Sequence, residues 1–339
     1  MIEKLDPESL ARPNIRALLP YSSARDEFTG DEGVFLDANE NPFGQRNRYP
    51  DPHQRLLKKA LSERKRIPVE NIFIGNGSDE VIDLIYRIFC EPQRDRVIIC
   101  PPTYGMYEVS ANINNVEVVQ VPLTERFDLD IDKILSYPAQ CIFVCSPNNP
   151  TGNRLHNAER LLAEFRGIVT VDEAYIDFSA GNSFLEKLTD YPNLIVMQTF
   201  SKAWGLAGAR VGVAYANAAI IALMDKTKPP YNVSAPNQAE ALKALSDPLE
   251  FERQVSVILD QRALLEKELK DLPAVRRVHP SDANFLLVEV TEANAMYQYL
   301  VDKKVIVRNR SAVVRNCLRI TVGTPEENRM LLDELRNYG

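Results

Sequence analysis

Residues 71–100 read NIFIGNGSDEVIDLIYRIFCEPQRDRVIIC. The apolar runs at 71–75 and 96–100 predict two strands, and residues 79–90 between them have the apolar spacing of an amphipathic helix. Similar pairs of patterns recur downstream: strand-like runs at 116–121, 141–145, 168–172, 194–200 and 211–215, and helical patterns at 104–112, 158–165 and 216–224. Near-continuous apolar strands that alternate with helices predict an α/β fold with a mostly parallel central sheet between helices.

The last third of the chain has a different pattern. Helices are expected over 236–272, followed by strands at 284–290, 305–308 and 317–322 and a final helix at 325–337. This order predicts a smaller α+β C-terminal domain at 236–339, after a large domain at 31–235. Residues 1–30 are expected to form an N-terminal arm, with a short helix, that packs with the small domain.

The composition is that of an ordinary soluble globular protein, with 339 residues, 45% apolar and 26% charged. The formal charge of -7 argues against a general binder of nucleic acid or of anionic membranes. The first six residues contain charges, so no secretory signal is expected, and no segment approaches the roughly 18–20 apolar residues that span a bilayer. We therefore expect a soluble, cytoplasmic protein.

The cysteines and histidines give no sign of a metal centre. The five cysteines are odd in number and lie mostly in apolar runs, so buried, reduced thiols are expected at positions 90, 100, 141, 145 and 317. The three histidines, at positions 53, 156 and 279, are scattered, and no metal is predicted.

The densest chemical signal is at residues 199–212, TFSKAWGLAGARVG. A lysine that forms an imine must lie close to its carbonyl partner and must often be deprotonated, and Lys202 follows directly after a predicted strand. The hydroxyls of Thr199 and Ser201, with the guanidinium of Arg210, could bind a phosphate ester. Taken alone, a lysine after a strand is more often a solvated side chain.

A carboxylate ends the predicted strand at 168–172. Asp172 stands where open α/β sheets bind their ligands, and it could pair with a pyridinium nitrogen and keep it protonated. Tyr175, three residues later, could donate to a hydroxyl on the same ring. The alternative is an aspartate that only caps the next helix.

Three turns after predicted strands carry further candidates. The turn at 75–80, GNGSDE, could hold a phosphate on the free N–H groups of the following helix, although it lacks the Gly-x-Gly-x-x-Gly spacing of a dinucleotide fold. In the turn at 101–105 Tyr104 could stack on a cofactor ring, and in the turn at 146–152 Asn149 could bind a ring hydroxyl. For the turn at 75–80 the alternative is a simple helix cap. For Tyr104 it is ordinary packing, and for the turn at 146–152 it is a plain turn.

Two arginines are candidates for binding an anion in the small domain. Arg319 lies within the apolar run at 317–322, and Arg308 lies at the end of the run before it. A buried guanidinium is unfavourable unless it meets an anion, so these residues point to an anionic substrate or to an internal salt bridge.

The order of these motifs along the chain resembles the aspartate-aminotransferase-like group of fold type I. The resemblance implies pyridoxal 5'-phosphate bound as a Schiff base to Lys202, with Lys202, Asp172 and Tyr104 as catalytic residues. It places Asp172 on the pyridine nitrogen, Tyr104 on the ring face, and Asn149 and Tyr175 on the ring oxygen. The implied phosphate ligands are Ser78, Asp79 (through backbone N–H groups), Thr199, Ser201 and Arg210, and Gly77 is a further implied cofactor-binding residue.

Within this group the chain resembles the histidinol-phosphate aminotransferase family, through PYSSAR at 20–25, DANENPFG at 37–44, RYPD at 48–51 and CLRITVG at 317–323. The resemblance implies transamination between L-histidinol phosphate and 2-oxoglutarate, giving imidazole-acetol phosphate and L-glutamate, in histidine biosynthesis. It also implies a homodimer with shared active sites, in which Tyr49 reaches the cofactor phosphate of the neighbouring subunit. The implied substrate contacts are Tyr21, Asn39, Arg308 and Arg319, while the nearby Arg310 and Arg315 leave open which arginine meets the substrate.

Other functions share parts of this pattern. An aromatic amino-acid aminotransferase or a threonine-phosphate decarboxylase would use the same cofactor residues. A non-catalytic binding protein on this fold usually needs an appended interaction module, and the sequence shows none. An NAD-dependent dehydrogenase does not fit the glycine spacing.

Overall fold

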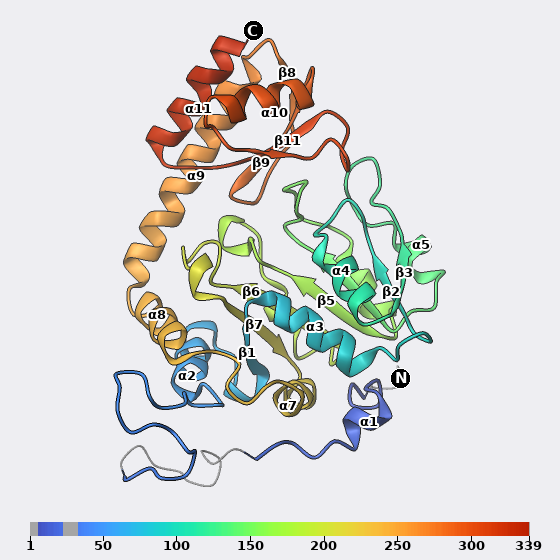
Figure 1. Cartoon of the computed structure of the whole chain (residues 1–339). Coiled ribbons are helices and arrows are strands. Elements are labelled where there is room, and N and C mark those ends of the chain that lie inside the picture. Colours follow the sequence, from blue (N-terminus) through green and yellow to red (C-terminus); the bar gives the residue numbers. More distant parts are fainter. Residues whose placement is uncertain (1–5, 23–32, 339) are drawn as a thin grey trace.

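A computed structural model describes residues 6–22 and 33–338 (Figure 1). Parts of the predicted N-terminal arm and residues 23–25 of the PYSSAR motif lie outside the described residues. A seven-stranded sheet forms the large half, in the order β1-β7-β6-β5-β4-β2-β3. Its strands are β1 (Ile72–Asn76), β2 (Arg96–Ile99), β3 (Glu117–Gln120), β4 (Cys141–Cys145), β5 (Ile168–Asp172), β6 (Leu194–Thr199) and β7 (Val211–Ala216).

Most neighbouring strands in this sheet are parallel. Strand β7 is the exception, since it pairs antiparallel with both β1 and β6. The predicted α/β class with a mostly parallel sheet is therefore confirmed. Because the parallel strands run the same way, their carboxyl ends meet at one edge of the sheet, where ligands of such folds bind.

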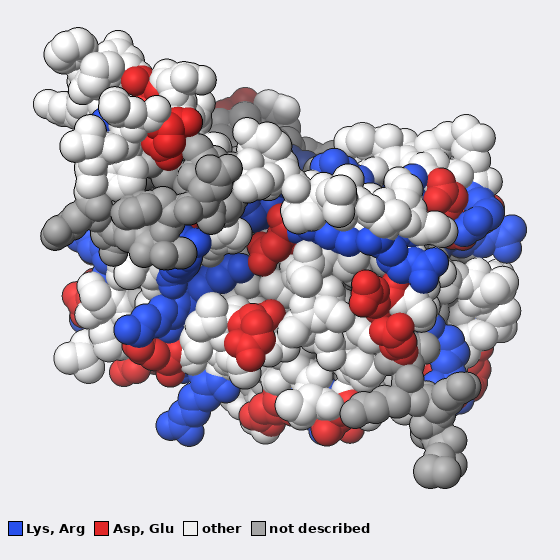
Figure 2. Space-filling model, turned by 90° about the horizontal axis from the view of Figure 1, so that it is seen from below, with Lys and Arg blue, Asp and Glu red and all other residues white. Residues whose placement is uncertain are grey.

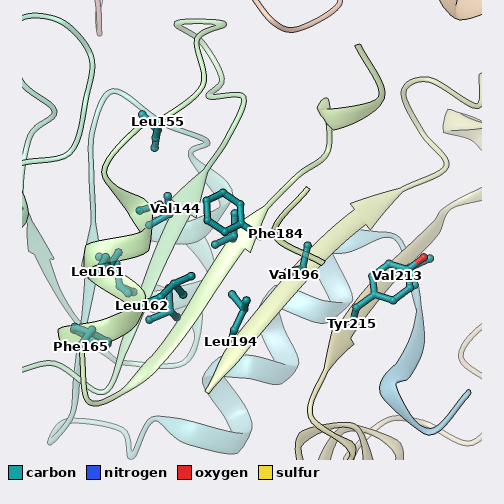
Figure 3. Packing of buried hydrophobic residues seen from close by; sticks show 14 of the residues in the cluster. Val144, Leu155, Leu161, Leu162, Phe165, Phe184, Leu194, Val196, Val213 and Tyr215 are labelled. Atoms are coloured by element: carbon teal, nitrogen blue, oxygen red, sulfur yellow. The ribbon is translucent and has the colours of Figure 1, made fainter. Parts of the chain in front are cut away.

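Helices cover both faces of the large sheet (Figure 1). The face with Ile142 and Val144 packs against α2 (Arg55–Lys65), α5 (Ile131–Leu135), α6 (Ala158–Glu164) and α8 (Ala235–Leu245). Figure 3 shows this core between the strands and α6. The opposite face, with Phe143, packs against α1 (Pro13–Arg16), α3 (Ser78–Phe89), α4 (Met106–Ile113) and α7 (Ala218–Thr227). Alternate residues of β4 thus enter different cores, which explains its uninterrupted apolar sequence.

The small half is an antiparallel sheet with helices. Its strands β8 (Val275–Val278), β9 (Phe285–Val290), β10 (Arg308–Asn309) and β11 (Cys317–Thr321) lie in the order β10-β11-β9-β8. The helices are α9 (Pro248–Lys270), α10 (Ala293–Asp302) and α11 (Pro325–Tyr338), and α9 leads from the large half to the small one (Figure 1). The division of the chain at residue 235 remains a prediction.

Some elements differ from the sequence prediction. Helix α2 was not predicted, because its charged sequence RLLKKALSERK contains few apolar residues. Strand β8 was missed because two arginines interrupt its apolar residues. The expected strand at 305–308 is wrong in position, since β10 contains only residues 308 and 309. Short edge strands with few ladder partners leave little periodicity in a sequence.

The cysteines and the surface charges can be compared with what the composition predicted. All five cysteines are buried and free, as predicted. On the face in Figure 2, basic and acidic side chains of the described residues are interspersed. In the described part of the chain, no helix combines the length and apolar character needed to cross a bilayer.

Candidate functional site

A cavity of about 520 Å³ opens at the carboxyl edge of the large sheet, facing β10 and β11 of the small half. Its volume is within the range of small-molecule sites. Most of the residues predicted from the sequence line it: Ser78, Asp79, Tyr104, Asn149, Asp172, Tyr175, Thr199, Ser201, Lys202, Arg210, Arg308 and Arg319. They come from segments that are far apart in the sequence, so only the fold brings them together.

One end of the cavity is suited to a phosphate. Helix α3 begins at Ser78, and its first N–H groups and its dipole favour an anion there. The Ser78 Oγ atom is buried and has no hydrogen-bond partner in the described structure. Gly77 has a φ of +75°, and a Cβ atom there would lie 2.5 Å from Nη2 of Arg210. Glycine is therefore needed for Arg210 to approach the helix start.

Arg210 completes this end of the cavity. It follows the turn after Lys202 and has a φ of +51°. Its Nη2 atom donates to Oδ2 of Asp79 at 3.2 Å. The hydroxyl-bearing Thr199 and Ser201 line the same cavity from the end of β6.

A buried carboxylate and a lysine that interact electrostatically line the same cavity. Asp172, at the end of β5, is 4% exposed, and burial raises its pKa. Three neighbours lower that pKa: the Tyr107 hydroxyl, the backbone N–H of Ala174 and the charge of Lys202. Burial, and then the charge of Arg319, lowers the pKa of Lys202. Its amine is thus more often neutral at neutral pH than that of an exposed lysine.

Two tyrosines and an asparagine form the walls around this pair. The Tyr104 hydroxyl donates to Oδ1 of Asp79 at 3.2 Å, and Tyr175 is buried with its ring centroid 5.7 Å from Nζ of Lys202. Asn149 is also buried, and its Oδ1 atom accepts a hydrogen bond from Nη1 of Arg319. A side chain of the small half is thereby joined to a turn of the large sheet.

Comparison with known proteins gives the family. The family model described as aminotransferase class I and II matches residues 30–335. This chain belongs to that family. Pyridoxal 5'-phosphate is the cofactor of these aminotransferases, as the sequence predicted.

Individual aminotransferases resemble the chain over nearly its whole length. A histidinol-phosphate aminotransferase from Parabacteroides distasonis is 54% identical, over 98% of this chain and 99% of the relative. A second one, from Cytophaga hutchinsonii, is 51% identical with the same coverage. The solved structure of histidinol-phosphate aminotransferase from Sinorhizobium meliloti, in complex with pyridoxal-5'-phosphate, is 25% identical, with a TM-score of 0.77 over 86% of this chain and 84% of that one. The family and the fold predicted from the sequence are confirmed.

Four predicted residues do not line the cavity of this aminotransferase. Gly77 is the N-cap residue of α3. Tyr21 is 74% exposed, and Asn39 lies in a segment with a positive φ before α2. Tyr49 is half-exposed, and its ring stacks on Tyr231 at a centroid distance of 4.3 Å. The roles expected for Tyr21, Asn39 and Tyr49 therefore remain predictions.

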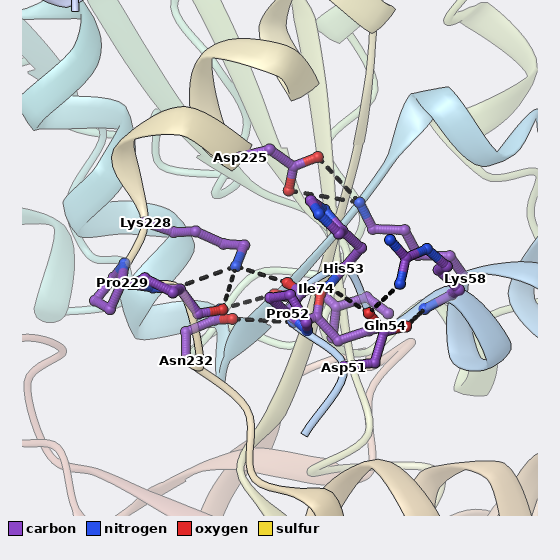
Figure 4. Close-up of polar contacts among 12 residues, drawn as sticks. Asp51, Pro52, His53, Gln54, Lys58, Ile74, Asp225, Lys228, Pro229 and Asn232 are labelled. Atoms are coloured by element: carbon purple, nitrogen blue, oxygen red, sulfur yellow. Dashed lines mark hydrogen bonds and ion pairs between the residues drawn. The ribbon is translucent and has the colours of Figure 1, made fainter. Parts of the chain in front are cut away.

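Polar contacts fix the segment after Tyr49 to the large sheet (Figure 4). The buried Lys228 amine donates to the carbonyl oxygens of Pro52 and Pro230, each at 2.8 Å. Asn232 accepts from Nε2 of Gln54 at 3.2 Å and donates to the carbonyl of Ile74, in β1, at 3.0 Å. The segment that presents Tyr49 is thus anchored to the strand before the phosphate-binding turn.

One residue near the site was missed. The Tyr107 hydroxyl donates to Oδ2 of Asp172 at 2.7 Å, while the ring is fully buried and stacks on Phe143 at 5.0 Å. The only signal in the sequence is its spacing of three from Tyr104, which precedes α4 and whose ring packs edge to face against that of Tyr107 at a centroid distance of 5.5 Å. A buried tyrosine in a helix looks like core packing until its hydroxyl partner is known.

Proposed function

We propose that this aminotransferase exchanges the amino group between L-histidinol phosphate and 2-oxoglutarate, giving imidazole-acetol phosphate and L-glutamate, in histidine biosynthesis. The observation that carries the proposal is the 54% identity to a histidinol-phosphate aminotransferase over 98% of the chain. The cavity supports it, because arginines of the small half line the same cavity as Lys202 and Asp172. Both substrates of this reaction carry anionic groups.

The residues of the cavity fit pyridoxal 5'-phosphate. The unpartnered Ser78 Oγ, the start of α3 and Arg210 would hold its phosphate, with Thr199 and Ser201. Asp172 would face the ring nitrogen and Tyr104 the ring, with Asn149 and Tyr175 at the ring oxygen. When bound, the cofactor supplies an electron sink for the bond electrons of the substrate Cα.

The side chains of this chain then perform distinct tasks. The amine of Lys202, with its lowered pKa, would act as the nucleophile that holds the cofactor and as the base that takes the proton from the substrate Cα. The buried carboxylate of Asp172 would stabilise positive charge at the ring nitrogen of the bound cofactor. Arg308 and Arg319 bind the anionic group of either substrate, because guanidinium groups pair with carboxylate and phosphate alike.

A substrate panel tests the proposed function against its rivals. The purified, cofactor-loaded enzyme is given L-histidinol phosphate, L-phenylalanine or L-threonine phosphate, with 2-oxoglutarate as the amino acceptor, and glutamate and CO2 are measured. We expect the highest kcat/KM with L-histidinol phosphate and no CO2. Preference for phenylalanine would identify an aromatic aminotransferase, and CO2 from threonine phosphate would identify a decarboxylase.

The enzyme is also proposed to be a cytoplasmic homodimer with shared active sites. The support is the position of Tyr49, which is anchored, half-exposed and outside the cavity of its own subunit. In a dimer a half-exposed hydroxyl in this position could reach the cofactor phosphate of the neighbouring subunit.

Mixing two defective variants tests the shared site. Lys202→Ala removes the nucleophile and Tyr49→Ala removes the group that crosses to the partner. Refolded together, the variants should form mixed dimers with one intact site, so activity should exceed the sum of the separate preparations. Additive activity in a sample shown by native mass spectrometry to contain mixed dimers would refute the shared site.

Replacing Tyr107 by phenylalanine should change the pH dependence of the reaction. The Tyr107 hydroxyl lowers the pKa of Asp172, so its removal raises that pKa. On the acid side of the pH profile, activity that needs ionised Asp172 is then lost at a higher pH. At pH values near this acid limb kcat/KM should fall about tenfold, the size of effect that a hydrogen bond to a charged group has. The measurement is the pH profile of kcat/KM.

Tyr86→Phe is the matched control. Tyr86 is equally buried, and its hydroxyl donates to the backbone carbonyl of Tyr107 at 2.8 Å, away from Asp172. It should lower stability without moving the acid limb. An unchanged acid limb in Tyr107→Phe would show that the hydroxyl does not tune Asp172.

A further inference from the structure

Three arginines of the small half meet at one end of the cavity. Arg308 in β10 is paired directly with Arg319 in β11, and Arg310 follows β10, with its backbone N–H donating to the carbonyl of Cys317 at 2.9 Å. All three side chains line the cavity. Within the described residues, none of them forms an ion pair with a carboxylate.

This arrangement is unfavourable without an anion. Like charges on directly opposed strand residues repel, as Arg308 and Arg319 do here. The Nε atom of Arg310 is buried without a hydrogen-bond partner in the described structure. Burial, then Arg319 and Arg308, lowers the pKa of Arg310, yet a guanidinium stays charged at any physiological pH. The three positive charges are therefore poised to bind a strongly anionic group.

We infer that Arg310 is a specificity-determining residue that recognises the second negative charge of the substrate phosphate. The inference rests on the proposed function. A phosphate monoester has a charge of about −1.5 to −2 and three acceptor oxygens at neutral pH, whereas a carboxylate has one charge and two oxygens. Arg308 and Arg319 suffice for a carboxylate of glutamate, and Arg319 also donates to Asn149. Arg310 supplies the third guanidinium that only the phosphate needs.

The neighbouring Arg315 provides a matched control. It lies in the same loop between β10 and β11, but it is exposed and does not line the cavity. Arg310→Gln and Arg315→Gln make the same chemical change a few residues apart. A general effect of removing positive charge from this loop would appear in both variants.

The test measures the two half-reactions separately in single turnovers of cofactor-loaded enzyme. The amino donors are L-histidinol phosphate, L-glutamate and unphosphorylated L-histidinol, and inorganic phosphate is added as a competing anion. In Arg310→Gln, kcat/KM for L-histidinol phosphate should fall about ten- to a hundredfold, and inhibition by phosphate should weaken similarly. The values for L-glutamate and L-histidinol should change by less than about threefold, as should all values in Arg315→Gln.

Each other outcome contradicts the inference. Equal losses with L-histidinol phosphate and L-glutamate would show that Arg310 serves both substrates or only the structure. Unchanged kinetics with L-histidinol phosphate would show that Arg310 does not contact the phosphate. If the unmodified enzyme reacts with L-glutamate but not with L-histidinol phosphate, the proposed function fails and this inference fails with it. Arg310→Lys, which keeps the charge, should recover part of the loss and exclude a folding defect.

Discussion

Lys202→Ala should lower turnover by about 10⁴-fold or more, because the base and the nucleophile of the proposed mechanism are lost together. Lys202 follows β6 and lies beside the buried Asp172, and its pKa is lowered by burial and by Arg319. No other lysine of the described residues lines the cavity, so none can replace it. The measurement is glutamate formation from L-histidinol phosphate and 2-oxoglutarate.

The control for this variant is Lys243→Ala. Lys243 is exposed on α8, far along the chain from the cavity segments, and its loss should leave turnover unchanged. Borohydride treatment should attach the cofactor to the peptide with residue 202 in the unmodified enzyme and to no peptide in Lys202→Ala. Near-normal turnover in Lys202→Ala would refute the assignment of this lysine.

Asp172→Asn should lower turnover about a hundred- to a few-thousandfold. Removing one member of a buried charge pair costs about 3–5 kcal/mol, and the amide cannot balance positive charge on the ring nitrogen. The fold should persist, because the amide oxygen can still accept from the Tyr107 hydroxyl, as Oδ2 of Asp172 does at 2.7 Å. Turnover and the dissociation constant of pyridoxal 5'-phosphate are measured together, so that lost binding is not mistaken for lost catalysis.

Asp260→Asn is the companion control, since Asp260 is exposed on α9. It should behave as the unmodified enzyme. Turnover of Asp172→Asn within about threefold of the unmodified enzyme, at saturating cofactor, would be a smaller change than the loss of one charged hydrogen bond typically causes. The carboxylate would then not be needed, and the proposed role of Asp172 would be wrong.

The sequence predicted the large sheet and most of the cavity for a physical reason. Buried parallel strands give uninterrupted apolar runs. Polar residues at or shortly after the carboxyl ends of these strands, such as Asp172 and Lys202, therefore lie at one edge of the sheet. Each of these site residues could therefore be predicted from the local sequence around the end of its own strand.

The remaining features depend on partners that are distant in the sequence. Tyr107 could not be distinguished from core packing, because its role depends on a hydroxyl contact with a residue 65 positions away. Strand β8, with two arginines, has no apolar run to reveal it. Tyr21, Asn39 and Tyr49 do not line the cavity, so the roles predicted for them from the sequence remain predictions.

Absorbance of the purified enzyme during titration with L-histidinol phosphate tests the central claim most directly. We predict a visible band from cofactor bound to Lys202, which borohydride fixes to the peptide with that residue, and which L-histidinol phosphate bleaches before 2-oxoglutarate restores it. A band that responds to L-glutamate but not to L-histidinol phosphate would contradict the proposed substrate. Absence of a band after addition of pyridoxal 5'-phosphate would contradict the role of Lys202 in binding the cofactor and every role that depends on it.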